Sequence, residues 1–280
     1  MWSTFRSYLL LMKPRIVMGN LLTGAAGFYL VSPRPIDRLL LMWMLLGLGA
    51  MIAAAAICNN VIDQEADQKM ERTSRRPLAQ NVLSSKAALL FALVLFLLSF
   101  LLCKASYAAW LAAFVGFLIY VFPYSFGKYK TPYATHVGSI AGAMPPLVGS
   151  FAAGKAFDLP TLVLFLLLLS WQMAHFFSIA LYYFEDYAKA AIPTFPHSKG
   201  IPCTQKERCC YTLVFALLAL ALPFVASAGL LYTPVIAPLS AGWAFLGVVG
   251  LYSSARLLHR LHFYHSLVLI LALCLVIILR

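Results

Sequence analysis

The stretch that decides the fold is "LLLMWMLLGLGAMIAAAAICNNVIDQEAD", which runs from Leu39 to Asp67. Its first nineteen residues, Leu39–Ile57, carry no charge, and a helix of about 20 apolar residues crosses the hydrocarbon core of a bilayer. Its last nine residues, 59–67, hold three acids and two asparagines. Charge is expensive next to a membrane. The stretch therefore predicts a membrane-spanning helix with a polar site at its end.

The rest of the chain repeats this apolar pattern. Of its 280 residues, 62% are hydrophobic and 11% are charged, whereas a soluble domain carries about 25% charged residues. No short alternating strands of the kind that build membrane barrels occur. The sequence therefore predicts an all-α, polytopic membrane protein with a single domain, residues 1–280. We expect about nine transmembrane helices, at residues 16–32, 39–58, 86–103, 107–123, 135–153, 160–181, 210–229, 233–252 and 263–279.

Lysine and arginine are distributed unevenly between the two sides that these helices define. With the N-terminus in the cytoplasm, sixteen of the 21 lysines and arginines fall on the cytoplasmic side. The other five, which include Lys104, fall on the far side. We expect this N-terminus to be retained, because no signal-peptide cleavage pattern follows it. The net charge of +12 is then mostly topological, and we expect no nucleic-acid binding. The six cysteines show no CxxC spacing, so we expect no disulfides.

Polar side chains recur every fourth residue at the end of the quoted stretch. Asn59, Asp63 and Asp67 would form one stripe, because four residues advance a helix only about 40° beyond a full turn. Carboxylate oxygens suit Mg²⁺, which takes one or two of them together with substrate phosphates and water. Arg72 and Arg76 follow closely, and a guanidinium group fits phosphate oxygens. The stretch predicts a site for magnesium and a diphosphate, with a solvated, salt-bridged helix end as the alternative.

A second polar group follows the predicted helix 160–181. His175, Tyr182 and Asp186 would share one face if that helix continues, because they are spaced by seven and then four residues. An ionisable residue inside a membrane span is a functional candidate by default. We expect a cleft with Asp186 at its mouth and His175 further in. The alternative is a histidine that is hydrogen-bonded between helices.

Other charged and histidine residues carry weaker signals. Lys13 and Arg15 open the first span, where they are either topological anchors or ligands of a diphosphate. Three histidines spaced by three, His259, His262 and His265, lie around the start of the last predicted span. No carboxylate accompanies them, so their spacing gives little support for a metal site.

Four further runs complete the pattern. They are "MKPRI" from Met12, "GSIAGAMPPLVG" from Gly138, "WQMAHF" from Trp171 and "EDYAKAAIPTFP" from Glu185. Together with residues 59–78, they resemble the UbiA superfamily of intramembrane prenyltransferases, and within it the branch that farnesylates haem. The resemblance covers residues 10–205, approximately. It implies a UbiA-type bundle in a bacterial inner membrane, with the active site near the cytoplasmic face.

The resemblance also implies an activity. Such an enzyme transfers the farnesyl group of farnesyl diphosphate to a vinyl group of haem B, making haem O for terminal oxidases. It implies Mg²⁺ as the cofactor, the lipid bilayer as the environment, and haem A synthase or a terminal oxidase as candidate partners. It assigns the metal and catalytic roles to Asn59, Asp63, Asp67 and Asp186 (preferred over Glu185), diphosphate binding to Lys13, Arg15, Arg72, Arg76 and Lys130, and haem binding to His175 and Tyr182.

Three positions depart from the family pattern. Ala174 stands where the family has the proline of "WQMPH". We assign the family's "KR" pair after the fourth span to Tyr129-Lys130, where lysine grips a phosphate less well than arginine. The family's "AGIPML" is replaced by a run that includes residues 191–195.

Three other functions compete with haem farnesylation. A UbiA-type enzyme with an aromatic or quinone-precursor acceptor would need the same metal site but not His175. A transporter of an anionic solute would place its charges near the bilayer midplane, whereas these charges cluster near one membrane face. A structural partner of an oxidase would tolerate the loss of Asp63.

Overall fold

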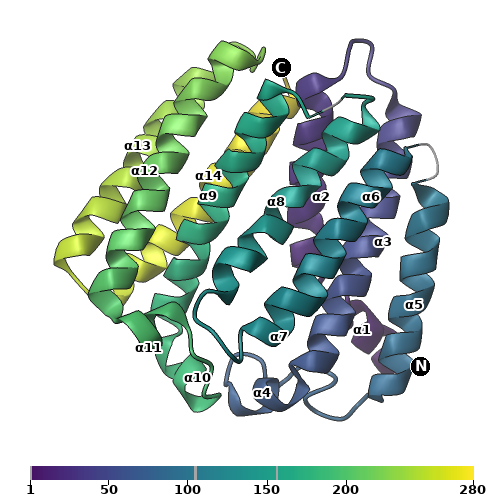
Figure 1. Cartoon of the computed structure of the whole chain (residues 1–280), viewed down its shortest axis with the longest axis vertical. Coiled ribbons are helices and arrows are strands. Elements are labelled where there is room, and N and C mark those ends of the chain that lie inside the picture. The colour runs from purple at the N-terminus through teal and green to yellow at the C-terminus, as the bar shows by residue number, and fades with distance from the viewer. Residues whose placement is uncertain (1, 104–105, 156) are drawn as a thin grey trace.

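Long helices cover every segment that was predicted to span the membrane (Figure 1). The computed structural model describes residues 2–103, 106–155 and 157–280, and all regular structure in those ranges is helical. The nine long helical stretches of the described residues are α2 (Pro14–Val31), α3 (Arg38–Ile62), α5 (Ser85–Leu102), α6 (Tyr107–Ile119) with its continuations η1 (Tyr120–Tyr124) and α7 (Ser125–Gly127), α8 (Ala134–Ala152), α9 (Leu159–Tyr182), α12 (Ile201–Val225), α13 (Tyr232–Tyr252) and α14 (Arg256–Ile278).

Seven of these stretches are long and apolar enough to cross a bilayer, counted over the part of the chain that the structure describes. The other two, α2 and α8, lie in the middle of the bundle and pack on each other. They join α3, α5 and α6 on one side to α9, α12, α13 and α14 on the other (Figure 1). Protein rather than lipid covers much of α2 and α8. They can therefore carry glycine, proline and polar residues that a lipid-facing helix would avoid.

Glycines allow α2 and α8 to approach each other closely. A Cβ added at Gly27 would overlap the carbonyl oxygen of Pro146 and lie 2.6 Å from the Pro146 Cα. A Cβ added at Gly149 would overlap the carbonyl oxygen of Gly24 and lie 2.6 Å from the amide nitrogen of Phe28. Backbone therefore meets backbone in both directions, as in other helix pairs with small residues at the interface.

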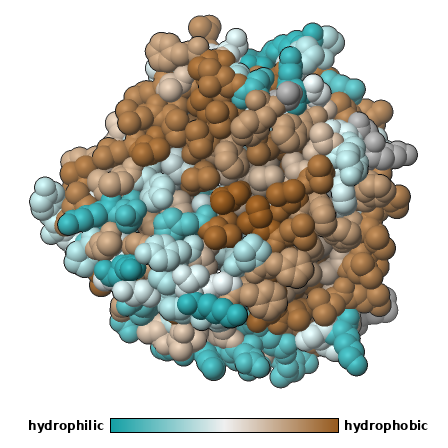
Figure 2. Space-filling model, viewed as in Figure 1, coloured by the Kyte–Doolittle hydropathy of each residue, from teal (hydrophilic) through white to brown (hydrophobic). Residues whose placement is uncertain are grey.

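Short helices gather at one end of the bundle. These are α1 (Trp2–Leu11), α4 (Gln64–Lys69), α7, α10 (Phe184–Lys189) and α11 (Phe195–Lys199). Figure 2 shows hydrophilic side chains along this lower end, a second hydrophilic group at the top, and a broad apolar region between them. The charge pattern assigns this end to the cytoplasm, and that assignment stays a prediction. Lys104, one of the five bases assigned to the far side, lies outside the described residues.

The early starts of α12 and α14 are a correction to the sequence analysis. The spans predicted at 210 and 263 begin at Ile201 and Arg256, so Arg208 and His259 lie inside the bundle instead of in loops. Arg208 Nη1 donates to His259 Nδ1 at 3.0 Å. This hydrogen bond between α12 and α14 gives both polar groups a partner away from water.

All six cysteines are free, as predicted.

Candidate active site

Asn59, Asp63 and Asp67 lie across the junction of α3 and α4. The helical hydrogen-bond pattern continues through this junction, with Asp63 N donating to Asn59 O at 2.9 Å and Asp67 N donating to Asp63 O at 2.8 Å. The three residues expose only 2%, 6% and 1% of their surface. The predicted stripe is therefore present and buried, and each of its oxygens needs a partner other than bulk water.

Each member of the stripe accepts a hydrogen bond from a base. The three bases come from three separate segments: the link between α1 and α2, the loop after α4, and the turn after α7. Charge-assisted hydrogen bonds of this length are among the strong ones in proteins. The site thus brings together acids that could hold a cation and bases that could hold an anion. The pairs are Lys13 Nζ to Asn59 Oδ1 at 2.6 Å, Arg76 Nη1 to Asp67 Oδ2 at 2.6 Å, and Lys128 Nζ to Asp63 Oδ2 at 2.5 Å.

Two tyrosines add neutral donors to the stripe. Tyr129 OH donates to Asp63 Oδ1 at 2.8 Å, and Tyr120 OH donates to Asn59 Oδ1 at 3.3 Å. Burial, and next the charge of Asp63, raise the pKa of Tyr129, so its phenol stays protonated. Asn59 Nδ2 donates to Ser125 Oγ at 3.0 Å, which fixes the amide with its oxygen toward the donors. Tyr120 belongs to η1, a single π-helical turn of a kind that is frequent at functional sites.

Lys13 is the base whose charge is most sensitive to its surroundings. Burial, and next the repulsion from Arg76, lower the pKa of Lys13 to about 7. A bound diphosphate would raise that pKa again, because a neighbouring negative charge favours the ammonium form. Lys13 is therefore placed to gain positive charge when an anion binds beside it.

Asp186 approaches the site from a different segment. It lies on α10, and its Oδ2 accepts a hydrogen bond from the Arg72 backbone N–H at 3.3 Å. The Arg72 guanidinium lies 4.6 Å from the centre of the Tyr183 ring, and its Nη2 donates to Tyr187 OH at 3.4 Å. The loop after α4 and the segment after α9 therefore meet at Arg72. Glu185 is exposed whereas Asp186 is half-buried, and the choice of Asp186 as the ligand stays a prediction.

The expected single stripe of His175, Tyr182 and Asp186 does not hold. α9 ends at Tyr182, and the chain bends at Tyr183, whose φ and ψ are −104° and 31°. His175 and Tyr182 face α14, where the Arg256 guanidinium lies 5.1 Å from the Tyr182 ring. Asp186 instead faces the loop after α4. His175 and Tyr182 therefore lie against α14, whereas Asp186 lies against the loop after α4.

The imidazole ring of His175 lies between two aromatic rings. Its ring stacks on Trp171, with centres 4.7 Å apart, and on Phe263 of α14, with centres 5.0 Å apart. Nδ1 lies 2.7 Å from Ser266 Oγ. The alternative predicted for this histidine, a hydrogen bond between helices, is therefore present at Nδ1. Nε2 makes no hydrogen bond among the residues that the structure describes.

Lys128, and not Lys130, is the lysine of this turn that contacts the stripe. Lys130 and Arg15 are exposed, and neither side chain forms an ion pair or hydrogen bond within the described part of the chain. Lys128 and Tyr129 both reach Asp63. The family's "KR" pair, counted one residue earlier as Lys128-Tyr129, would have identified both positions.

Replacing Lys128 with alanine is expected to weaken the binding of inorganic diphosphate with Mg²⁺ about 10- to 100-fold. The lost charge-assisted hydrogen bond is worth roughly 1.5–3 kcal/mol, and each 1.4 kcal/mol is about tenfold in affinity. Lys130→Ala is the matched control, and we expect it to change affinity less than about twofold, because it removes one exposed charge. Calorimetric titration of the purified protein measures both. Equal effects of the two variants would contradict the placement of Lys128 in the site.

The residues present fit a magnesium ion that is bound together with a diphosphate. Asp67 Oδ1 is buried and has no hydrogen-bond partner among the described residues, which leaves an anionic oxygen for a cation. Among the residues that the structure describes, no three Asp, Glu, His or Cys side chains converge there as a metal cage. Mg²⁺ typically takes only one or two carboxylates and completes its shell with phosphate and water oxygens. The donor set therefore suits a metal that arrives with its substrate.

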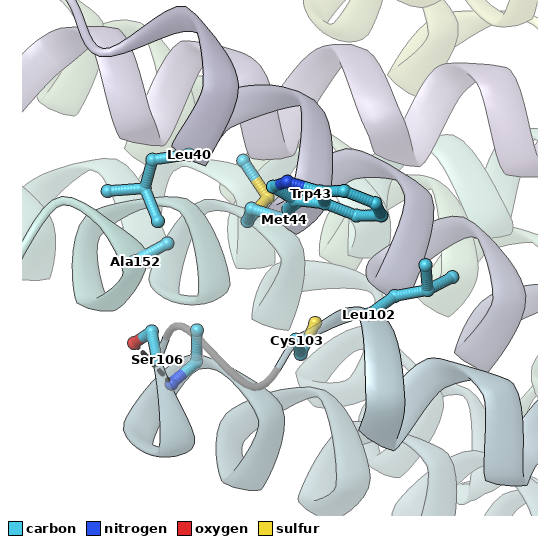
Figure 3. Close-up of a pocket in the computed structure, with 8 residues that line it drawn as sticks. Leu40, Trp43, Met44, Leu102, Cys103, Ser106 and Ala152 are labelled. Atoms are coloured by element: carbon cyan, nitrogen blue, oxygen red, sulfur yellow. Dashed lines mark hydrogen bonds between the residues drawn. The ribbon is translucent and has the colours of Figure 1, made fainter.

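A small pocket at the opposite end of the bundle is not a substrate site. Figure 3 shows it between the start of α3, the end of α5, the start of α6 and the end of α8. Trp43, Met44, Cys103 and Ser106 are among its lining residues, and its volume is about 10 Å³. That is room for about one water molecule.

The fold and the site define an integral membrane protein whose helices hold, at one end, buried acids that are paired with bases. The chain belongs to the UbiA prenyltransferase family, whose model matches residues 20–268.

Relatives of known name support a narrower similarity. The chain is 41% identical over 249 residues to the protoheme IX farnesyltransferase of Protochlamydia amoebophila (strain UWE25), covering 88% of each chain. It is 37% identical over 269 residues to the protoheme IX farnesyltransferase of Acinetobacter baumannii (strain AYE), covering 95% of this chain and 92% of that one.

Solved structures establish the fold independently. A digeranylgeranylglyceryl phosphate synthase matches with a TM-score of 0.79 at 20% identity, over 99% of this chain and all of that one. A UbiA homologue from Archaeoglobus fulgidus bound to DMAPP and Mg²⁺ matches with a TM-score of 0.68 at 19% identity, over 97% of this chain and 99% of that one. The all-α, UbiA-type fold predicted from the sequence is confirmed.

Proposed function

We propose that this chain transfers the farnesyl group of farnesyl diphosphate to a vinyl group of haem B, making haem O. The observation that carries the proposal is the buried stripe of Asn59, Asp63 and Asp67, each member of which meets a base. Acids and bases that share one buried end of a membrane bundle suit a metal-bound diphosphate with an apolar tail. The two named relatives described above, both protoheme IX farnesyltransferases, support haem as the acceptor.

The chain's own residues would bind and activate the diphosphate. Asn59, Asp63 and Asp67, with Asp186, would hold Mg²⁺, which when bound neutralises charge on the leaving diphosphate. Four bases would donate N–H groups to the diphosphate oxygens as negative charge develops on them: Lys13, Arg72, Arg76 and Lys128. Such preorganised donors are the usual source of the largest catalytic effects.

The reaction breaks two bonds to carbon, the allylic C–O bond and the vinyl π bond, and forms two, a C–C bond and a C–O bond. The allylic C–O bond of farnesyl diphosphate breaks, and its electron pair leaves on the diphosphate. The π electrons of the haem vinyl group form the new C–C bond, and a water molecule supplies the hydroxyl group and loses a proton. Tyr120 and Tyr124 stack with ring centres 5.2 Å apart beside Asn59. Their π faces would stabilise a cationic carbon.

The finer localisation and partners belong to the same proposal. The end with α4 and α10 would face the cytoplasm of a bacterium, because sixteen of the 21 lysines and arginines fall on that side. The haem O that is made there would pass to haem A synthase or to a terminal oxidase.

The test is a transfer assay with the full chain in detergent. Haem B, farnesyl diphosphate and Mg²⁺ are expected to give a product whose mass equals haem plus a farnesyl group and a hydroxyl group, and the product should disappear when EDTA is added. His175→Ala is expected to lower this transfer more than about tenfold while diphosphate binding is unchanged, because the substitution removes a side chain that would bind haem and leaves the stripe of Asn59, Asp63 and Asp67 intact. A chain that binds farnesyl diphosphate with Mg²⁺ but prenylates an aromatic acceptor instead of haem would contradict the proposal.

A further inference from the structure

Ser266 on α14 is held by two side chains of α9. Its carbonyl oxygen accepts the Trp171 indole N–H at 2.9 Å, and its hydroxyl oxygen lies 2.7 Å from His175 Nδ1. Ser266 itself is fully buried. Two contacts one helical turn apart therefore fix Ser266 against the face of α9 that carries His175.

The hydroxyl proton of Ser266 has a partner other than the histidine. Ser266 Oγ donates to the carbonyl oxygen of Phe263 at 2.6 Å. A serine hydroxyl has one proton to donate and two lone pairs to accept with. With its proton on Phe263 O, the Ser266 hydroxyl is left to accept from His175, which would place the imidazole proton on Nδ1 and leave a lone pair on Nε2.

The neighbouring His262 shows what a structural histidine looks like in the same seam. Its Nδ1 accepts the Trp243 indole N–H at 3.1 Å, and its Nε2 lies 3.2 Å from Thr212 Oγ1. The Thr212 hydroxyl donates to Arg208 O at 2.7 Å, so it accepts from His262 Nε2. Both nitrogens of His262 are thus used within the protein. His175 differs, because its Nε2 has no hydrogen bond among the described residues and the residue keeps 8% of its surface exposed.

We infer that Ser266 is a positioning residue that holds His175 as the Nδ1–H tautomer and presents the Nε2 lone pair to the haem acceptor. The inference rests on the proposed function for the identity of that acceptor. A neutral imidazole with a free Nε2 is a ligand that suits haem iron. The second hydrogen bond of such a histidine sets its tautomer and ring orientation. Stacking on Trp171 and Phe263 would keep the ring from turning.

The first experiment reads the tautomer without any haem. Nitrogen-15 NMR of the histidine-labelled full chain in lipid, with the His175→Ala spectrum used to assign the signal, is expected to show His175 protonated at Nδ1. Ser266→Ala removes the acceptor and should shift the population toward Nε2–H. Ser170→Ala is the matched control, because Ser170 is also buried and its hydroxyl donates only to Leu167 O. A wild-type His175 protonated at Nε2 would overturn the inference.

The second experiment titrates the same proteins with haem B and follows the absorption spectrum. Wild type is expected to give an imidazole-ligated spectrum. Ser266→Ala should bind about 10- to 100-fold more weakly, the usual effect of losing a partner of a metal-binding histidine. Ser266→Thr keeps the hydroxyl and should restore the wild-type spectrum, while Ser170→Ala should leave it unchanged.

Two results of the titration would overturn the inference in distinguishable ways. Equal haem affinity and an equal spectrum for wild type and Ser266→Ala would remove Ser266 as a positioning residue and leave the proposed function standing. A wild type that shows the Nδ1–H tautomer and binds farnesyl diphosphate, but neither binds nor prenylates haem, would remove haem from both. Farnesyl diphosphate binding by each variant verifies that the site at α3 and α4 has folded.

Discussion

Asp63→Asn is expected to lower the rate of farnesyl transfer roughly 100- to 1,000-fold, the usual effect of removing one group that stabilises developing charge. Asp63 accepts from Lys128 at 2.5 Å and from Tyr129 at 2.8 Å, and it exposes only 6% of its surface. Asparagine keeps the shape but removes the negative charge that would hold Mg²⁺ and orient these donors. The rate is measured at saturating farnesyl diphosphate and haem B, with Mg²⁺ varied over several concentrations.

Glu65→Gln is the matched control for this experiment. Glu65 lies two residues further on, is exposed, and makes no ion pair within the described residues. We expect its rate to stay within about twofold of wild type, because an isolated surface charge contributes little. Comparable losses in the two variants would mean that the whole acidic segment acts through its net charge. If both variants kept an activity comparable to that of wild type, the alternative interpretation of the segment, a salt-bridged helix end without a catalytic role, would be favoured.

Gly27→Ala is expected to destabilise the protein by about 1–3 kcal/mol, the usual cost of overpacking a close contact. The atoms that the new Cβ would meet are the Cα and carbonyl group of Pro146, and backbone cannot turn aside as a side chain can. α2 and α8 would have to separate along their whole contact. Thermal unfolding in detergent, followed by circular dichroism, measures the loss as a lower apparent Tm.

Gly19→Ala tests the same change on the same helix without the contact. A Cβ at Gly19 would meet nothing within 4 Å. Alanine is also the better helix former, by about 0.5–1 kcal/mol. We therefore expect an unchanged or slightly higher apparent Tm. If the Gly27→Ala protein were as stable as the Gly19→Ala protein, the close approach of α2 and α8 would not be what limits stability at this position.

The features that the sequence predicted well are those that depend on neighbours in the chain. α3 and α5 follow directly from hydropathy, because lipid-facing helices must be apolar over their length. The stripe of Asn59, Asp63 and Asp67 follows from helical spacing alone, since the hydrogen-bond pattern continues through the junction of α3 and α4. No distant contact is needed for either result.

The features that were wrong depend on distant partners. Arg208 lies inside α12 because His259, 51 residues away, accepts its hydrogen bond. Lys128 rather than Lys130 reaches Asp63 because of how the turn after α7 lies against α3, which no local pattern reports. The bend at Tyr183 separates Asp186 from His175, although their spacing suits one helical face. Hydropathy and spacing cannot register contacts of this kind.

The pairing of each carboxylate in the stripe with a base has a consequence for the order of events. Lys128 and Arg76 form ion pairs with Asp63 and Asp67, so a metal ion that binds alone would compete with the bases, and a diphosphate that binds alone would compete with the carboxylates. Each ligand would release the groups that the other one needs. Their affinities would then be coupled, and by thermodynamic reciprocity each would strengthen the other by the same factor. The protein would respond weakly to either ligand alone and strongly to their complex.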